Sequence, residues 1–376
     1  MNSRVLLTLF FCLNAVIAFR SPLISLKSKS NSVDDPVKDD GYALAVQIEI
    51  GTRPQKFKMA VSTTFADTWV ADRTCRYESG CKPSCSTHCM SFECEGCCEY
   101  SECPIKIRFD SEKSKTYQSK GQNWTYENSL SGFIGSDVIT LTGTGITIQS
   151  ATFVQANALG DPVCSNCDDV SGIFGLAISE TNKSSLFEQA VQSGAVENSQ
   201  IGIWMNKTFD STTGDTIGEL TFAGYDQVKC PGSLLSVPLT GSDWRFTLTG
   251  GIAGKYQISD EWTTVLSPDF YTIDLPGDLY DNLYKSINAY YDDELENDVA
   301  DCNQDVQLTL KVNDADIVLE FTDYTTRIGD VCALDVMSLQ YLPTDDNVIL
   351  GSRFLNAYCA IVDAKTQLIS FTRVVS

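Results

Sequence analysis

Histidine and basic residues are scarce in this sequence. Of its 376 residues one is a histidine, His88, and 27 are Lys or Arg against 49 Asp or Glu, which gives a formal charge of −22. A nucleic-acid binder needs a basic face, so this charge balance excludes that class. An acidic surface keeps a protein soluble, and it also fits tolerance of low pH or basic partners.

Long apolar runs are absent after the N-terminus, and none approaches the ~18 residues that a membrane-spanning helix needs. The first stretch, MNSRVLLTLFFCLNAVIA, has Arg4, then an apolar run, then small residues at Val16 and Ala18. This pattern predicts a signal peptide over residues 1–18, cleaved after Ala18. The C-terminus, RVVS, shows no retention signal. We therefore expect a secreted or lumenal protein.

What is present fits a globular, mostly β chain, with 43% apolar and 20% charged residues. Residues 19–40 are polar and are expected to form a short exposed leader. From Tyr42 apolar residues alternate, with Leu44 to Ile50 on one face of a strand. Helical spacing recurs in TNKSSLFEQAVQSG, which Gly194 could end, and after Pro276. The length allows two lobes.

The chain has 15 cysteines, and loss of Cys12 with the signal peptide leaves an even number. In an oxidising compartment this predicts disulfides throughout. Eight of the cysteines form one insertion over residues 75–103: Cys75, Cys81, Cys85, Cys89, Cys94, Cys97, Cys98 and Cys103. With His88 they offer a zinc site as an alternative, but disulfides among themselves are expected, and their connectivity stays open.

Two shorter features also fit secretion. The pair Cys164 and Cys167 frames a C-x-x-C, for which a local structural disulfide is expected rather than a redox site. The sequons at Asn123, Asn182 and Asn206 are candidate glycosylation sites. No metal or cofactor is expected.

An internal repeat organises the chain. In the first half an apolar strand leads to a turn at Ser62, and SGIFGLA follows later. In the second half an apolar strand leads to a turn at Ser267, and NVILGSRF follows later. The first copy is longer, and the cysteine-rich insertion accounts for the difference. We expect a duplicated lobe.

Six segments in the same order resemble the pepsin-like aspartic proteases, over about residues 42–375. They are VQIEIGTRPQKFKMAVSTTFADTWVAD, TYENSLSGFIGSDVITL, SGIFGLA, GELTFAGYD, VLSPDFYTIDLP and VILGSRFLNAYCAIVDAKTQLISF. The resemblance implies a bilobal, mostly β fold with a central cleft. The expected N-terminal lobe covers residues 41–224 and the C-terminal lobe residues 225–376. The resemblance also implies a disulfide between Cys302 and Cys332. It further implies a disulfide between Cys230 and Cys359, as in some nematode-type members of the family.

The catalytic residues of that family do not carry over. Trp69-Val70 aligns with the W-V after the first family motif and puts Ser62 on the first aspartate, and Pro276 puts Ser267 on the second. The turns read Ser-Thr-Thr and Ser-Pro-Asp in place of D-T-G. Hydrolysis on this fold needs two carboxylates that share a proton and a water. A serine hydroxyl stays neutral and cannot replace a carboxylate as general base.

Other parts of the site are expected to persist. Tyr126 aligns with the tyrosine of the family's flap, and Trp69 aligns with its usual hydrogen-bond partner, although both could be packed aromatics. Asp67 or Asp269 could supply a displaced carboxylate, and Asp269 is the better candidate. The serines are otherwise small polar fillers. A serine nucleophile needs an adjacent base, the only histidine lies in the insertion, and no motif indicates a lysine base.

Together these features predict a secreted homologue that has lost catalysis and acts by binding. The expected partner is a peptide or apolar ligand in the cleft, or a protein on the cysteine-rich insertion, and the chain is expected to be a monomer. The alternative is an active aspartic endopeptidase, as the fold alone suggests.

Overall fold

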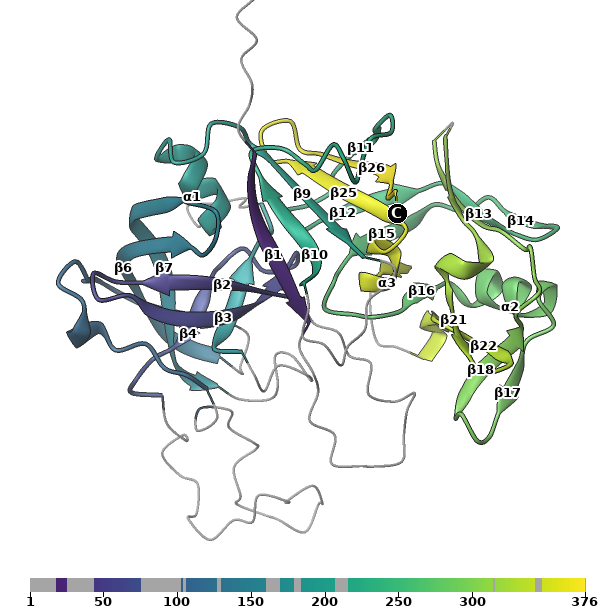
Figure 1. The fold of residues 1–376 in the computed structure, drawn as a ribbon, viewed down its shortest axis with the longest axis horizontal. Helices are drawn as coiled ribbons and strands as arrows, with labels where there is room; N and C mark the ends of the chain where they lie inside the picture. The colour runs from purple at the N-terminus through teal and green to yellow at the C-terminus, as the bar shows by residue number, and fades with distance from the viewer. Residues whose placement is uncertain are drawn as a thin grey trace, which may run out of the picture.

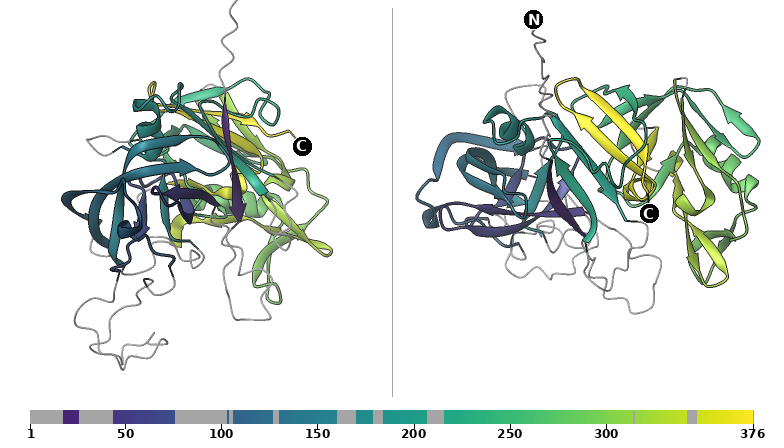
Figure 2. Two further views of the ribbon diagram at one scale, coloured as in Figure 1. Left: turned by 60° about the vertical axis from the view of Figure 1, so that its left-hand side comes forward. Right: turned by 45° about the horizontal axis from the view of Figure 1, so that its top comes forward.

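A computed structural model describes residues 18–25, 44–75, 103, 106–126, 130–159, 170–178, 184–206, 216–313, 315–341 and 347–375. The chain is mostly β, which confirms the prediction from alternating apolar residues. Figure 1 shows the strands of the first half, in purple to teal, on one side and those of the second half, in green, on the other. The strands β9, β10, β25 and β26 lie between the two groups, and Figure 2 shows the same arrangement from two further directions.

The largest sheet spans both halves of the chain. In the described residues thirteen strands pair in the order β11-β26-β25-β9-β10-β1-β2-β3-β8-β4-β7-β6-β5. Their bounds are Leu235–Pro238, Leu368–Arg373, Tyr358–Asp363, Gln200–Met205, Thr216–Phe222, Phe19–Ser25, Leu44–Ile50, Gln55–Ser62, Gly172–Gly175, Trp69–Ala71, Thr147–Leu159, Leu130–Leu141 and Gln118–Tyr126. Since β25 and β26 pair into this sheet beside β9 and β10, the last residues of the chain tie the second half to the first.

Three smaller sheets lie in the second half of the described chain. The first has the order β12-β15-β24-β16-β23, at Arg245–Leu248, Trp262–Leu266, Val348–Leu350, Ile273–Leu275 and Val336–Ser338. The second has the order β14-β13-β19-β20, at Tyr256–Ile258, Gly250–Ala253, Leu308–Val312 and Ala315–Leu319. The third has the order β17-β18-β22-β21, at Tyr290–Asp292, Asn297–Asp301, Val331–Leu334 and Thr325–Ile328.

Helices are short. The α-helices are α1 (Leu186–Gln192), α2 (Gly277–Ser286) and α3 (Ser352–Leu355), and 3₁₀ turns cover Ser111–Lys113, Phe321–Asp323 and Leu339–Tyr341. Ser185 and Glu188 form a capping box at the start of α1, for which no start was predicted. Pro276 is the N-cap of α2, so this helix begins where the sequence indicates. None of the described helices is long and apolar enough to cross a membrane.

The segment after residue 18 departs from expectation. We expected an exposed leader over residues 19–40, but Phe19–Ser25 forms β1, which pairs with β10 and with the start of β2. Leu23 is fully buried in the core, and Arg20 forms an ion pair with Asp226 across a 2.8 Å contact. The prediction of exposure is therefore wrong for these residues, because the buried Leu23 and the ion pairs of Arg20 with Asp226 and Glu219 anchor the segment.

The two halves repeat one strand pattern. In the first half β3 pairs in parallel with β8, β8 pairs antiparallel with β4, and β4 pairs in parallel with β7. In the second half β15, β24, β16 and β23 pair in the same sequence and with the same directions. This repetition brings the ends of β3 and β15, where Ser62 and Ser267 lie, into equivalent positions.

Candidate functional site

The first loop, residues 62–68, leaves the end of β3. Ser62 pairs with Gly175 on β8, and the carbonyl oxygen of Ser62 accepts a 2.8 Å hydrogen bond from the Leu176 amide. A β-carbon at Gly175 would lie 2.6 Å from the carbonyl oxygens of Phe65 and Ala66. The glycine therefore lets β8 support the loop at close range. Ser62 is buried as a result, with 1% of its surface exposed.

The second loop, residues 267–272, repeats this support at the end of β15. The Ser267 amide donates a 3.0 Å hydrogen bond to the carbonyl oxygen of Leu350 on β24. A β-carbon at Gly351 would lie 2.2 Å from the carbonyl oxygen of Thr272. Ser267 is as deeply buried as Ser62. Both serines thus lie on supported turns at the centre of the molecule.

Asp269 joins the two serines. Its Oδ2 accepts a 2.9 Å hydrogen bond from Ser62 Oγ and a 3.4 Å hydrogen bond from Ser267 Oγ. Since Ser62 donates its hydroxyl proton to the carboxylate, its oxygen accepts from Thr64 Oγ1, at 3.1 Å. We call this group of side chains, Ser62, Thr64, Ser267 and Asp269, the loop junction. It holds one carboxyl group, which bridges the two loops.

Burial changes the acidity of that carboxyl group. Desolvation raises the pKa of Asp269 from 3.8 to about 6, and the hydrogen bonds from Ser62 and Ser267 lower it in part. Neither serine can supply a charge of its own in the useful pH range. The loop junction therefore titrates as a single carboxyl group near pH 6.

A buried threonine links the loops a second time. Thr63 Oγ1 donates a 2.5 Å hydrogen bond to the carbonyl oxygen of Leu266, the residue that precedes the second loop. The position after Ser267 is Pro268, which has no hydroxyl group and cannot return this bond from the second loop. Trp244 supports the same contact, because its amide donates to Thr63 O and its indole N–H to Leu176 O. This link therefore uses a hydroxyl donor from the first loop, and Pro268 provides no equivalent donor from the second loop.

The side chains that replace glycine do not strain the loops. Thr64 and Asp269 stand where the resembling family has the glycine of each D-T-G turn. Neither has a positive φ, although other described residues such as Ala223 do. The turns accept β-carbons because their backbones stay in regions that any residue can adopt.

A hairpin of β5 and β6 lies where the resemblance predicts a flap. Its Tyr126 packs against Phe65 of the first loop, with ring centroids 4.5 Å apart, and stacks on Trp124 at 6.3 Å. The expected bond to Trp69 is not formed: the Trp69 indole N–H is buried and has no hydrogen-bond partner in the described part of the chain. Tyr126 thus packs against aromatic side chains, which was the alternative that the sequence left open.

Asp67 is not part of the loop junction. Its Oδ2 accepts a 2.8 Å hydrogen bond from the indole N–H of Trp124 on β5. Of the two carboxylates considered for a displaced role, Asp269 is the one whose side chain bonds to the two serines. The sequence analysis did not identify Trp124 as a site residue, although Trp124 directly follows the sequon residue Asn123.

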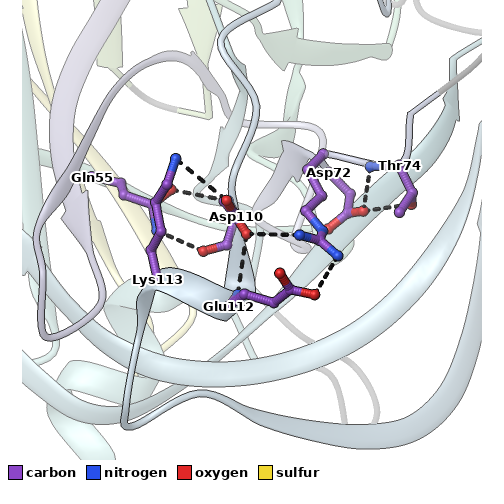
Figure 3. Close-up of polar contacts among 7 residues, drawn as sticks. Gln55, Asp72, Thr74, Asp110, Glu112 and Lys113 are labelled. Atoms are coloured by element: carbon purple, nitrogen blue, oxygen red, sulfur yellow. Dashed lines mark hydrogen bonds and ion pairs between the residues drawn. The ribbon is translucent and has the colours of Figure 1, made fainter.

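The base of the cysteine-rich insertion is clamped. Cys75 and Cys103 form a disulfide, and Arg73 pairs with Asp110 and Glu112 just outside it. Lys113 also pairs with Asp110, and Asp72 accepts hydrogen bonds from Thr74 (Figure 3). The other six cysteines of the insertion and His88 lie outside the described residues, so their predicted pairing remains a prediction.

The remaining predicted residues are placed as follows. Cys230–Cys359 and Cys302–Cys332 are disulfides, with Cα atoms 6.1 Å and 5.1 Å apart, and these are the pairs that the resemblance implied. Asn123 and Asn206 are exposed, while Asn182, Cys164 and Cys167 lie outside the described residues. Among the described residues no group of three His, Cys, Asp or Glu side chains could hold a metal ion.

Comparison with known proteins agrees with this geometry. The family model for the eukaryotic aspartyl protease matches residues 42–374. Aspartic protease 10 of Caenorhabditis elegans is 25% identical, over 94% of this chain and 89% of its own. Aspartic protease 2 of Necator americanus is 24% identical, over 87% and 82%. Cathepsin E-A of Xenopus laevis is 26% identical, over 88% and 79%.

Proposed function

Because the chain belongs to the eukaryotic aspartyl protease family, we propose that it binds polypeptide segments in the family's cleft and does not hydrolyse them. The observation that carries this proposal is the loop junction, where Ser62, Ser267 and the single carboxyl group of Asp269 replace a carboxylate pair. The protein acts in a secreted or lumenal compartment, which its disulfides fit.

The chemistry of hydrolysis requires two carboxyl groups with different protonation states. Repulsion between two close carboxylates splits their apparent pKa values, so that one is a base while the other is an acid. Asp269 has no carboxylate neighbour among the groups that shift its pKa, and among the described residues only the two serine hydroxyls form side-chain hydrogen bonds with it. It can accept a proton or donate one, but it cannot do both in one step.

The surroundings of the loop junction favour binding. Phe65 and Tyr126 pack together on the first-lobe side, and Phe270, next to Asp269, is 43% exposed. Each of the two loops thus carries an aromatic residue, and aromatic side chains near a polar centre suit an extended peptide with apolar side chains. The hairpin of β5 and β6 stands over the first loop through the Tyr126–Phe65 contact.

An active endopeptidase is the rival function, and one observation favours it: a carboxyl group that titrates near pH 6 does lie at the loop junction. We rank it second because a water molecule polarised by one carboxyl group has no partner to protonate the leaving amine. A serine nucleophile with Asp269 as base ranks lower still, since Ser62 is almost fully buried.

Acid proteolysis distinguishes these functions. The secreted protein is incubated with denatured globin across acidic to neutral pH, with and without a statine-type inhibitor, beside an active family member. We expect no inhibitor-sensitive cleavage by this chain and complete cleavage by the active enzyme. Cleavage by this chain that the inhibitor abolishes would overturn the proposal.

Peptide binding needs its own measurement. A library of extended apolar peptides is screened for binding to the wild-type protein and to the Phe65→Ala and Tyr126→Ala variants. We expect a subset of peptides that both variants bind more weakly by about tenfold, because each loses an aromatic contact. A library without any peptide of this behaviour would count against a peptide-binding cleft.

A further inference from the structure

The loop junction has a feature that peptide binding alone does not explain: within the described part of the chain, its carboxyl group has no cationic partner. Of the two carboxyl oxygens, Asp269 Oδ2 accepts both serine hydrogen bonds, and no described residue donates a hydrogen bond to Oδ1. No Lys or Arg among the described residues forms an ion pair with it. A half-buried carboxylate of this kind is costly to keep charged unless a ligand pairs with it.

From this geometry we propose that the loop junction recognises a protonated primary amine carried between apolar groups, as on a lysine side chain flanked by apolar residues. The inference rests on the proposed peptide binding and names its chemical class. The amine would donate to Asp269 Oδ1, while the serines keep Oδ2 in place. A compact ammonium group suits a single exposed oxygen better than a planar guanidinium group, which is matched to two.

Nearby charged groups do not compete for this role. Behind the second loop, Asp335 pairs with Arg353 of α3 at 3.0 Å, and the Arg353 amide donates to the carbonyl oxygen of Tyr271. Asp274 of β16 accepts a 2.6 Å hydrogen bond from Thr272. On the first loop Asp67 bonds to Trp124. None of these groups appears among the causes that shift the pKa of Asp269, so its charge is set locally.

The apolar part of the ligand also has a defined environment. Tyr126 and Phe65 form one aromatic wall, and Phe270 presents an exposed ring from the second loop. An ammonium group close to aromatic faces gains a further cation–π attraction. Acidic ligands are disfavoured at this place, because a net charge of −22 repels them before they reach Asp269.

Binding should follow the charge of Asp269. The pKa of the carboxyl group is raised to about 6 by burial, so in the free protein it is mostly ionised at neutral pH and mostly protonated at about pH 5. An amine ligand needs the ionised form. Its apparent affinity should therefore fall by about tenfold between about pH 7.5 and pH 5, with uptake of the ligand releasing close to one proton at the lower pH.

The test compares two matched peptides, Ac-Leu-Ala-Lys-Phe-Ala-NH2 and the same peptide with norleucine in place of lysine, by titration calorimetry. At neutral pH we expect the lysine peptide to bind the wild-type protein about tenfold more tightly. The preference should disappear in Asp269→Asn and at the lower pH. It should persist in Asp293→Asn, which removes one exposed charge of the same sign far from the junction in sequence. Circular dichroism checks that both variants fold.

The remaining outcomes distinguish a failure of amine recognition from a failure of peptide binding. Equal binding of the two peptides by the wild-type protein would overturn amine recognition and leave peptide binding in place. Binding of 4-phenylbutylamine, but not of 4-phenylbutanol or of either peptide, that is lost in Asp269→Asn would support the amine site and overturn peptide binding. A lysine preference that survives in Asp269→Asn would overturn the assignment to this residue.

Discussion

The side chains of Ser62 and Asp269, 207 positions apart in the sequence, are joined by a 2.9 Å hydrogen bond. The bond crosses from the first loop to the second, and Ser267 donates to the same oxygen. The centre of this molecule is therefore held together by a carboxyl group that belongs to neither aligned catalytic position. The predictions below test what this carboxyl group, the loops and the first strand do.

Asp269 should make stability depend on pH. Its pKa in the folded protein, about 6, lies above its ordinary value of 3.8. Because the folded state holds the proton more tightly than the unfolded state, protonation of Asp269 stabilises the folded protein. This contribution to stability is fully present below about pH 4 and is lost as the pH rises through about 6. Asp269→Asn should therefore gain about 1–3 kcal/mol relative to wild type between those limits. Urea unfolding across this range measures it, with Asp293→Asn as control. A constant difference at all pH values would contradict the raised pKa.

Restoring the carboxylate pair should restore hydrolysis. The variant carries Ser62→Asp, Ser267→Asp, Pro268→Thr and Asp269→Gly. These changes recreate both carboxylates and the second D-T-G turn, while the first turn reads Asp-Thr-Thr. Because the supporting strands and glycines are in place, we expect inhibitor-sensitive cleavage of globin at acidic pH.

The matched control for this variant keeps Ser62 and carries the other three changes, so that one carboxyl group remains. It should stay inactive. A four-residue variant that folds and still fails to cleave would show that the hairpin of β5 and β6, in addition to the loops, has lost its catalytic form.

The hydroxyl group of Thr63 should contribute more to the free energy of unfolding than an average surface hydroxyl group does. Its hydroxyl is the donor to the buried Leu266 carbonyl, and Pro268 cannot compensate for its loss. Thr63→Val, which keeps the shape, should lower the free energy of unfolding by about 1–3 kcal/mol. Thr63→Ser should recover most of it. Equal stability of the Val variant and the wild type in chemical denaturation would show that the loops do not need this link.

The first strand should remain part of the mature protein. Cleavage after Ala18 would leave Phe19, the first residue of β1, as the N-terminus. N-terminal sequencing of the secreted protein should read Phe-Arg-Ser. Leu23→Ala should cost about 2–5 kcal/mol, because Leu23 is fully buried, whereas Leu23→Met should cost less than about 1.5 kcal/mol. A mature protein that starts after residue 25 and is equally stable would contradict this role for β1.

Much of the fold could be predicted from the sequence because its signals are local and periodic. The alternation from Leu44 to Ile50 predicted the strand β2, and apolar residues at helical spacing predicted the helices α1 and α2. The order of the six family-like segments indicated the repeated strand pattern. The first strand was missed, because apolar and polar residues do not alternate regularly over residues 19–25, and pairing with β10, distant in sequence, and with the start of β2 places it in the sheet.

The loop junction was only partly predictable for a related reason. Alignment placed Ser62 and Ser267 at equivalent turns, but which carboxylate reaches them depends on side-chain directions in two turns that meet only in the folded protein. The same limit applies to Trp69 and Tyr126, whose expected bond is replaced by packing of Tyr126 on Phe65 and Trp124.

The most direct test of the central claim measures binding and cleavage in one sample. A peptide that binds through Asp269 is incubated with a molar excess of the wild-type protein at acidic and at neutral pH, and the mixture is analysed by mass spectrometry. With the protein in excess, even one slow turnover per molecule would be visible. We predict that the peptide is bound at neutral pH and is recovered intact at every pH. Fragments that accumulate with time, and that a statine-type inhibitor suppresses, would contradict the account.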